Sequence, residues 1–125
     1  AYASMLDKKM GNIDWNKSAV VIERLIRGLN PWPSAFTHLN GKMLKIWDAD
    51  VYTKEQAEAE FPEYSTDFKG AEPGQIVAVL PHTFFIGCGK DLLKVNEVQA
   101  EGKKRMTSDA FLRGSRLEKG MELGK

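Results

Sequence analysis

The chain has 125 residues and a formal net charge of +1, and 42% of its residues are hydrophobic, 28% charged and 10% aromatic. This composition is typical of one globular domain that is large enough to fold without disulfides or a structural metal. The single cysteine, Cys88, favours a reducing compartment, and no apolar run approaches the roughly 20 residues that cross a bilayer. We therefore expect a cytoplasmic protein.

The charges are distributed unevenly along the chain. Residues 48–72 contain eight acidic and two basic residues, a balance of −6, whereas the other 16 basic and 9 acidic residues give +7. A basic body with an acidic segment can bind a polyanion on one side although its overall composition is nearly neutral. The chain begins Ala-Tyr-Ala without a methionine, which suggests a part of a longer polypeptide.

The first half of the chain predicts a linker and a helix. Residues 1–12 show little apolar periodicity and are expected to form an extended entry segment or a linker. An amphipathic helix is predicted from Lys17 to Arg27, with Asn16 as its cap and a glycine and prolines at its end. Prolines on both sides of Trp32 predict an extended run. We expect Trp32 to anchor the helix to the rest of the domain.

Short β-rich runs follow. Ala35–Leu39 and Lys42–Tyr52 flank Asn40-Gly41, which is the strongest short-range signal for a β-hairpin. Three further strands are predicted over residues 76–80, 83–88 and 92–98.

The segments between and after these strands predict helices and a loop. Thr53 is expected to cap a short acidic helix that ends at Phe61, and residues 62–74 are expected to form a polar, mobile loop. Thr107 is expected to cap a short helix that ends at Gly114. The elements together predict a mainly β, α+β fold: a small Greek-key β-barrel preceded by one amphipathic helix and followed by a short C-terminal helix. Residues 13–125 would form this domain, with an acidic insert at about residues 53–72.

The sequence offers little for catalysis or metal binding. Cys88 lies in a β run with no histidine near it, which is typical of a small buried side chain rather than a nucleophile. His38 and His82 have no second ligand at metal-binding spacing, and the acidic residues lack the pattern of a calcium loop. We predict no catalytic, cofactor-binding or metal-ligating residue in this chain.

The basic residues are the main candidates for a functional site. They could line one side of the barrel and bind a phosphate backbone without reading its sequence, although an ordinary solvated surface is the alternative for such charges. Several aromatic side chains, among them Trp47 and the Phe84-Phe85 pair, could stack on bases but are expected to pack in the core. The predicted phosphate-binding residues are Lys8, Lys9, Lys42, Lys45, Lys94, Lys103, Lys104 and Arg105.

Several runs resemble the C-terminal domain of bacterial methionyl-tRNA formyltransferase. They are Ile13-Asp14-Trp15, the segment from Ile22 to Pro33 that ends Asn-Pro-Trp-Pro, Leu39 to Lys42, Val98-Gln99, Glu101 to Met106 and Phe111 to Gly114. Tyr2-Ala3 is similar to the linker that leads in from the catalytic domain. The resemblance covers nearly the whole chain.

The resemblance implies a two-domain enzyme that transfers a formyl group from 10-formyltetrahydrofolate to the methionine of initiator tRNA. In that family an N-terminal domain holds the folate site and an Asn, His and Asp catalytic set, and the C-terminal domain is an OB-like β-barrel that lies along the tRNA with a basic face. No residue of this chain matches the catalytic motifs. The resemblance therefore implies a tRNA-binding domain that is inactive alone, with initiator methionyl-tRNA and an N-terminal formyltransferase domain in cis as its partners.

The folate would then be a co-substrate of the full-length enzyme, and this domain would bind no cofactor. Two alternatives remain open. The chain could be the barrel module of a related folate-dependent formyltransferase that packs on its catalytic domain without binding RNA. It could also be a free-standing enzyme, for which the sequence supplies no set of reactive residues.

Overall fold

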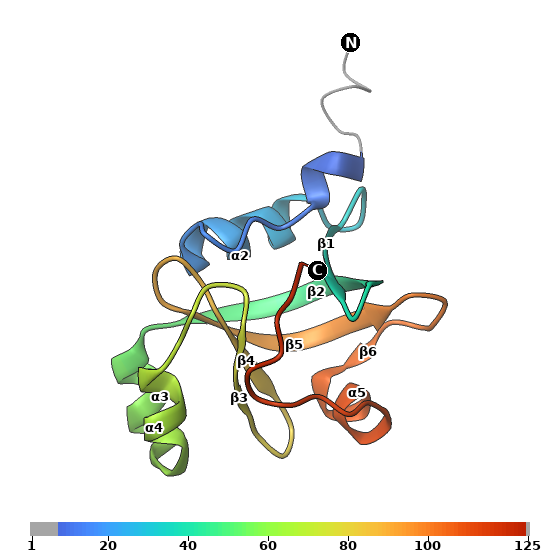
Figure 1. Ribbon diagram of the computed structural model, residues 1–125. Helices are drawn as coiled ribbons and strands as arrows, with labels where there is room; N and C mark the ends of the chain where they lie inside the picture. Colours follow the sequence, from blue (N-terminus) through green and yellow to red (C-terminus); the bar gives the residue numbers. More distant parts are fainter. Residues whose placement is uncertain (1–7, 125) are drawn as a thin grey trace.

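Six antiparallel strands and six helical segments make up the fold of the described residues (Figure 1). The computed structural model describes the backbone of residues 8–124 and the side chains of residues 10–124. The helical segments are η1 (Lys8–Gly11), α2 (Ala19–Gly28), α3 (Lys54–Glu60), η2 (Pro62–Tyr64), α4 (Ser65–Lys69) and α5 (Ser108–Gly114), of which η1 and η2 are 3-10 turns and α4 continues directly from η2. The strands are β1 (Ala35–Leu39), β2 (Lys42–Tyr52), β3 (Ile76–Val79), β4 (Phe84–Gly87), β5 (Leu92–Ala100) and β6 (Met106–Thr107).

The predicted α+β fold is confirmed, but its strands form an open sheet rather than a closed barrel. The sheet has the order β1-β2-β5-β4-β3, and β6 pairs with β5. The C-terminal segment lies against both edge strands, because Leu123 bridges Leu39 at the end of β1 and Glu122 bridges Gln75 just before β3. Figure 1 shows this segment in red, crossing the sheet toward β2. The predicted closure of the barrel was wrong, because the C-terminal segment lies between the two edge strands and no β1–β3 ladder forms.

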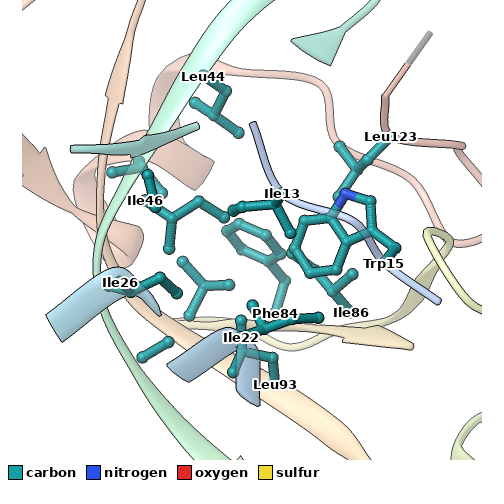
Figure 2. Close-up of a cluster of buried hydrophobic side chains, with 14 of the residues drawn as sticks. Ile13, Trp15, Ile22, Ile26, Leu44, Ile46, Phe84, Ile86, Leu93 and Leu123 are labelled. Carbon is teal, nitrogen blue, oxygen red and sulfur yellow. The ribbon is translucent and has the colours of Figure 1, made fainter. Parts of the chain in front are cut away.

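Helix α2 covers the main core, as predicted. It buries Ala19, Ile22 and Ile26 against residues of β2, β4 and β5, and Figure 2 shows Ile22 and Ile26 pointing into this cluster. Its cap is Ser18, whose hydroxyl accepts a hydrogen bond from the Val21 amide, and not Asn16. The predicted start was too early because the Asn16 amide donates to the Asp14 carboxylate in a turn that precedes the helix.

The tryptophan that anchors the region of α2 is Trp15 and not Trp32. Trp15 is buried beside Leu123 (Figure 2), and its Nε1–H donates to the buried Thr37 hydroxyl at 3.0 Å. Trp32 is 59% exposed and lies in a turn, with the Ser34 amide donating to the Leu29 carbonyl and both X–Pro bonds in cis. Both the anchoring role and the extended conformation predicted for Trp32 were wrong.

The acidic segment forms a second, smaller core instead of a mobile loop. Phe68 of α4 is fully buried and makes an edge contact with Phe85 of β4, with 4.9 Å between ring centroids. Ala57 of α3 and Val77 of β3 complete this cluster with other apolar residues. The caps predicted for the short helices are confirmed, since Thr53 accepts from the Gln56 amide and Thr107 from the Ala110 amide. Within the described residues, no helix is long and apolar enough to span a membrane.

Candidate nucleic-acid interface

The outer face of the β2–β5 ladder gathers two of the predicted basic residues around one tryptophan. Leu44 and Ile46 are buried in the core, whereas Lys45 and Trp47 alternate with them and face outward. The Trp47 Nε1–H donates to the side-chain oxygen of Gln99 at 3.0 Å. The Lys45 ammonium lies 5.7 Å and the Arg105 guanidinium 4.8 Å from the centre of the Trp47 ring. We call Lys45, Trp47, Gln99 and Arg105 the outer cluster.

The charge of the outer cluster is partly neutralised. Arg105 donates from Nε to the Glu97 carboxylate at 2.6 Å, and both side chains are partly exposed. The ring of Trp47 is half-buried and already in contact with cations, which corrects its predicted place in the core. Phe84 and Phe85 are fully buried, as predicted.

Lys94 lies apart from this cluster and is committed to acidic neighbours. Its ammonium is 3.8 Å from an Asp50 carboxylate oxygen and 3.3 Å from the side-chain oxygen of Asn96. The Asn96 amide in turn donates to the carboxylates of Asp48 and Asp50. This pairing follows from register, since Asp50 lies opposite Lys94 on the β2–β5 ladder. The structure therefore does not bring Lys94 together with the other predicted residues.

The opposite end of the sheet carries cations without acidic partners. Lys42, Lys103 and Arg116 line one groove, and Lys104 is the exposed neighbour of Lys103 in the β5–β6 turn. Within residues 10–124, no ion pair is formed by any of these four side chains. We call Lys42, Lys103, Lys104 and Arg116 the basic rim.

Tight turns and the C-terminal segment place the basic rim. Asn40 and Gly41 both have positive φ, as expected for a two-residue hairpin turn, and Lys42 follows them at the start of β2. Gly102 has a φ of 75°, which a side chain would make unfavourable, and turns the chain so that Lys103 faces the hairpin end. Arg116 arrives from the stretch after α5.

Arg116 was absent from the predicted set. Its basic neighbours in the sequence, Arg113 and Lys119, form ion pairs elsewhere with Asp109 and Asp67. The packing of α5 against β5 brings Arg116 to Lys42 and Lys103. The side chains of Lys8 and Lys9 lie outside the described residues. Their backbone belongs to η1, which lies next to β1, because Asn12 bridges Phe36.

Burial perturbs two titratable side chains of the described residues. Burial raises the pKa of the Cys88 thiol to about 12, with a contribution from the Asp91 charge, so that the thiolate is strongly disfavoured. Burial and the Glu60 carboxylate raise the pKa of Tyr52 to about 12. Among the described residues, no group of three His, Cys, Asp or Glu side chains could hold a metal ion.

The structure defines a small α+β domain with an open antiparallel sheet and a basic end, where three cations and one acidic residue, Glu101, line the same groove and form no ion pair within the described part of the chain. The family model described as "Formyl transferase, C-terminal domain" matches residues 5–116. The chain therefore belongs to the family of formyl transferase C-terminal domains, and the resemblance seen in its sequence is confirmed.

Two curated relatives illustrate the similarity of the sequence. The chain is 56% identical over 124 residues to a methionyl-tRNA formyltransferase of Lachnospira eligens, covering 99% of this chain and 37% of that protein. It is 48% identical over 119 residues to a methionyl-tRNA formyltransferase of Agathobacter rectalis, covering 95% of this chain and 34% of that protein. The chain thus spans little more than a third of the length of these relatives.

Solved structures share the fold at low identity. HypX from Aquifex aeolicus in complex with tetrahydrofolic acid matches with a TM-score of 0.61 and 13% identity over 86% of this chain and 17% of that chain. A variant of the same protein matches with a TM-score of 0.59 and 14% identity over 90% of this chain and 19% of that chain. At this identity the match establishes similarity of fold alone.

Proposed function

We propose that this chain is the tRNA-binding C-terminal domain of a methionyl-tRNA formyltransferase. It would hold initiator methionyl-tRNA while an N-terminal domain transfers the formyl group of 10-formyltetrahydrofolate, in the cytoplasm. The observation that carries the proposal is the basic rim, whose four cations have no acidic partner among the described residues. The names of the relatives supply the RNA and the reaction.

The charge distribution supports an oriented mode of binding. The basic rim and the acidic segment around α3 and α4 lie at opposite ends of β2 (Figure 1). β2 has 11 residues, which corresponds to about 33 Å between its ends at 3.3 Å per residue. This is several times the screening length of about 8 Å at physiological salt, so the acidic end does not cancel the attraction of the basic end. A polyanion is drawn to one end of the domain and repelled by the other.

Positioning is the contribution expected of such a domain. Each phosphate contact releases counterions and adds affinity without reading the sequence of the RNA. A second binding module in the same polypeptide raises the effective concentration of the substrate at the catalytic domain, because the second binding event becomes intramolecular. The reaction then gains from proximity, a contribution that requires no catalytic group in this chain.

A second candidate function is packing on the catalytic domain without RNA. It is favoured by exposed apolar side chains on and near α2, namely Met10, Val20, Val21 and Trp32. These side chains do not line the groove of the basic rim, so a docking surface for a preceding domain and an RNA-binding end can coexist. The two candidates differ in whether the chain binds RNA at all.

Binding of labelled tRNA to the chain by fluorescence anisotropy separates these candidates. We expect a dissociation constant in the range of about 10⁻⁴ to 10⁻⁶ M at physiological salt, tightening as salt is lowered. Replacing Lys42, Lys103 and Arg116 by alanine should weaken binding strongly, whereas replacing Lys17 and Arg24, which are exposed on the α2 side, should not. Absence of tRNA binding by the folded chain at about 50 mM salt would refute the RNA role and leave the packing function.

A further inference from the structure

We propose that the groove at the basic rim binds one unpaired nucleotide of an RNA, with its base on the apolar floor and its phosphates at the cations. This inference rests on the proposed function and adds to it a site for a base. The groove has a volume of about 360 Å³, which lies within the range of about 300–1,000 Å³ typical of ligand pockets.

The floor of the groove is apolar and is assembled from three parts of the chain. Leu39 and Leu44 come from the β1–β2 hairpin, Phe111 from α5, and Leu117 from the segment that follows α5. Leu44, Phe111 and Leu117 are buried in the main core, so they have fixed neighbours on their inner side. A flat apolar group bound here would displace water from the outer side of these residues, whose inner side already packs against the core.

Charge and hydrogen-bonding groups surround the apolar floor. Lys42, Lys103 and Arg116 stand at its rim. The one acidic residue of the lining, Glu101, accepts a hydrogen bond from the Met43 amide and forms no ion pair with them within residues 10–124. The Asn40 amide and the Ser115 hydroxyl also line the groove, and neither has a hydrogen-bond partner in the described part of the chain. The complementary ligand has a flat body with polar edges and an attached anion. A nucleotide has this combination.

The geometry favours an unpaired nucleotide over a duplex. In an RNA helix the faces of the bases are stacked and their edges are paired, and the deep major groove excludes side chains. The bases of loops and ends can leave the stack. A base that enters the groove must have one face free to contact Leu39 and Leu117. The phosphates on either side of it then lie near Lys42, Lys103 and Arg116.

Methyl NMR of the chain tests the location directly. Titration with a single-stranded oligoribonucleotide should shift the methyl resonances of Leu39, Leu44 and Leu117. Inorganic polyphosphate of similar charge should bind the rim but leave these methyl groups unchanged, because it has no base. The methyl groups of Ile26, on the buried face of α2, serve as an internal control. RNA binding with unmoved floor methyl groups, or equal shifts with polyphosphate, would overturn the proposal.

Two variants separate the base from the phosphates. Ser115→Trp fills the groove and should weaken oligoribonucleotide binding about tenfold with an unchanged salt slope, because one base loses its contact surface. Thr66→Trp, at an exposed position of α4, is the matched control. Arg116→Ala should instead reduce the slope of log K against log salt by about 0.7.

The outcomes keep the two proposals distinct. Wild-type affinity in Ser115→Trp would exclude the base site while the RNA role stands. If the wild-type chain binds no RNA at low salt, the RNA role is refuted, and the base site is refuted with it.

Discussion

Free and paired cations should differ in what they contribute to RNA binding. Lys103 and Lys104 lie in the β5–β6 turn without acidic partners among the described residues, whereas the Lys94 ammonium is held by Asp50 and Asn96. A phosphate that approaches Lys94 must also face the carboxylates of Asp48 and Asp50. We therefore predict that the double variant Lys103→Ala, Lys104→Ala loses RNA affinity and that Lys94→Ala changes it little.

The size of the effect follows from the number of contacts. Each phosphate contact contributes about −0.7 to −0.9 to the slope of log K against log salt. If all four cations of the basic rim contact phosphates, raising the salt from about 50 to about 200 mM should weaken tRNA binding about a hundredfold. With two contacts left in the double variant, the same change should weaken binding only about tenfold.

Fluorescence anisotropy with labelled tRNA over a salt series gives these slopes, and circular dichroism verifies the fold of each variant. Lys94→Ala is the matched control, since it also removes one lysine from the β5 region. The single variant Lys103→Ala is measured beside it. If Lys94→Ala reduced the salt slope as much as Lys103→Ala does, ion pairing would not determine which cations bind phosphates. An unchanged slope in the double variant would show that the basic rim does not contact the phosphates.

Three further predictions concern the acidic segment and the two perturbed side chains. Phe68→Ala should lower the free energy of unfolding by about 3–5 kcal/mol in urea denaturation, because Phe68 is fully buried; a mobile loop would give almost no change. The pKa of Tyr52 in the folded protein is about 12, so the protonated Tyr52 hydroxyl should contribute to stability below about pH 10. This contribution should be lost as the pH rises toward 12. Glu60→Gln should lower the pKa of Tyr52, which tyrosinate absorbance measures. Cys88 should not react with thiol reagents at mildly alkaline pH until the protein unfolds, and rapid reaction of the native protein would contradict its burial.

Local signals in the sequence were sufficient for most elements of the fold. The Asn40-Gly41 turn and the caps at Thr53 and Thr107 act within a few residues, so their consequences can be read without knowing the rest of the molecule. Phe68 shows where this approach fails. Its helix has five residues and no side-chain cap, and it is stabilised by the contact with Phe85, which lies 17 residues away. Such a helix exists because of tertiary packing and leaves little local signal.

The two tryptophans on either side of α2 show the same limit. Trp15 and Trp32 both flank an amphipathic helix, and residue type alone favours burial of each. The difference arises from distant partners, because Thr37 accepts the hydrogen bond of Trp15 and Leu123 of the C-terminal segment packs beside it (Figure 2). The turn that carries Trp32 has no comparable cover, and 59% of this side chain stays exposed.

The candidate site depended on strand register, which the sequence does not specify. A lysine on a strand is neutralised or left free according to the residue that the neighbouring strand places opposite it. Lys94 lies opposite Asp50, and Arg105, one residue before β6, reaches Glu97 of β5. Both belong to the predicted phosphate-binding set, yet both have an acidic partner.

Residues in turns and in the C-terminal segment escape this pairing, because no strand lies opposite them. Lys103 and Lys104 follow the Gly102 turn, and Arg116 follows α5, so their charges remain available at one end of the sheet. Ionic attraction of a polyanion depends on net local charge, and a cation that already holds a carboxylate adds little to it. The fold therefore turns a chain with a net charge of +1 into a domain with one strongly basic end.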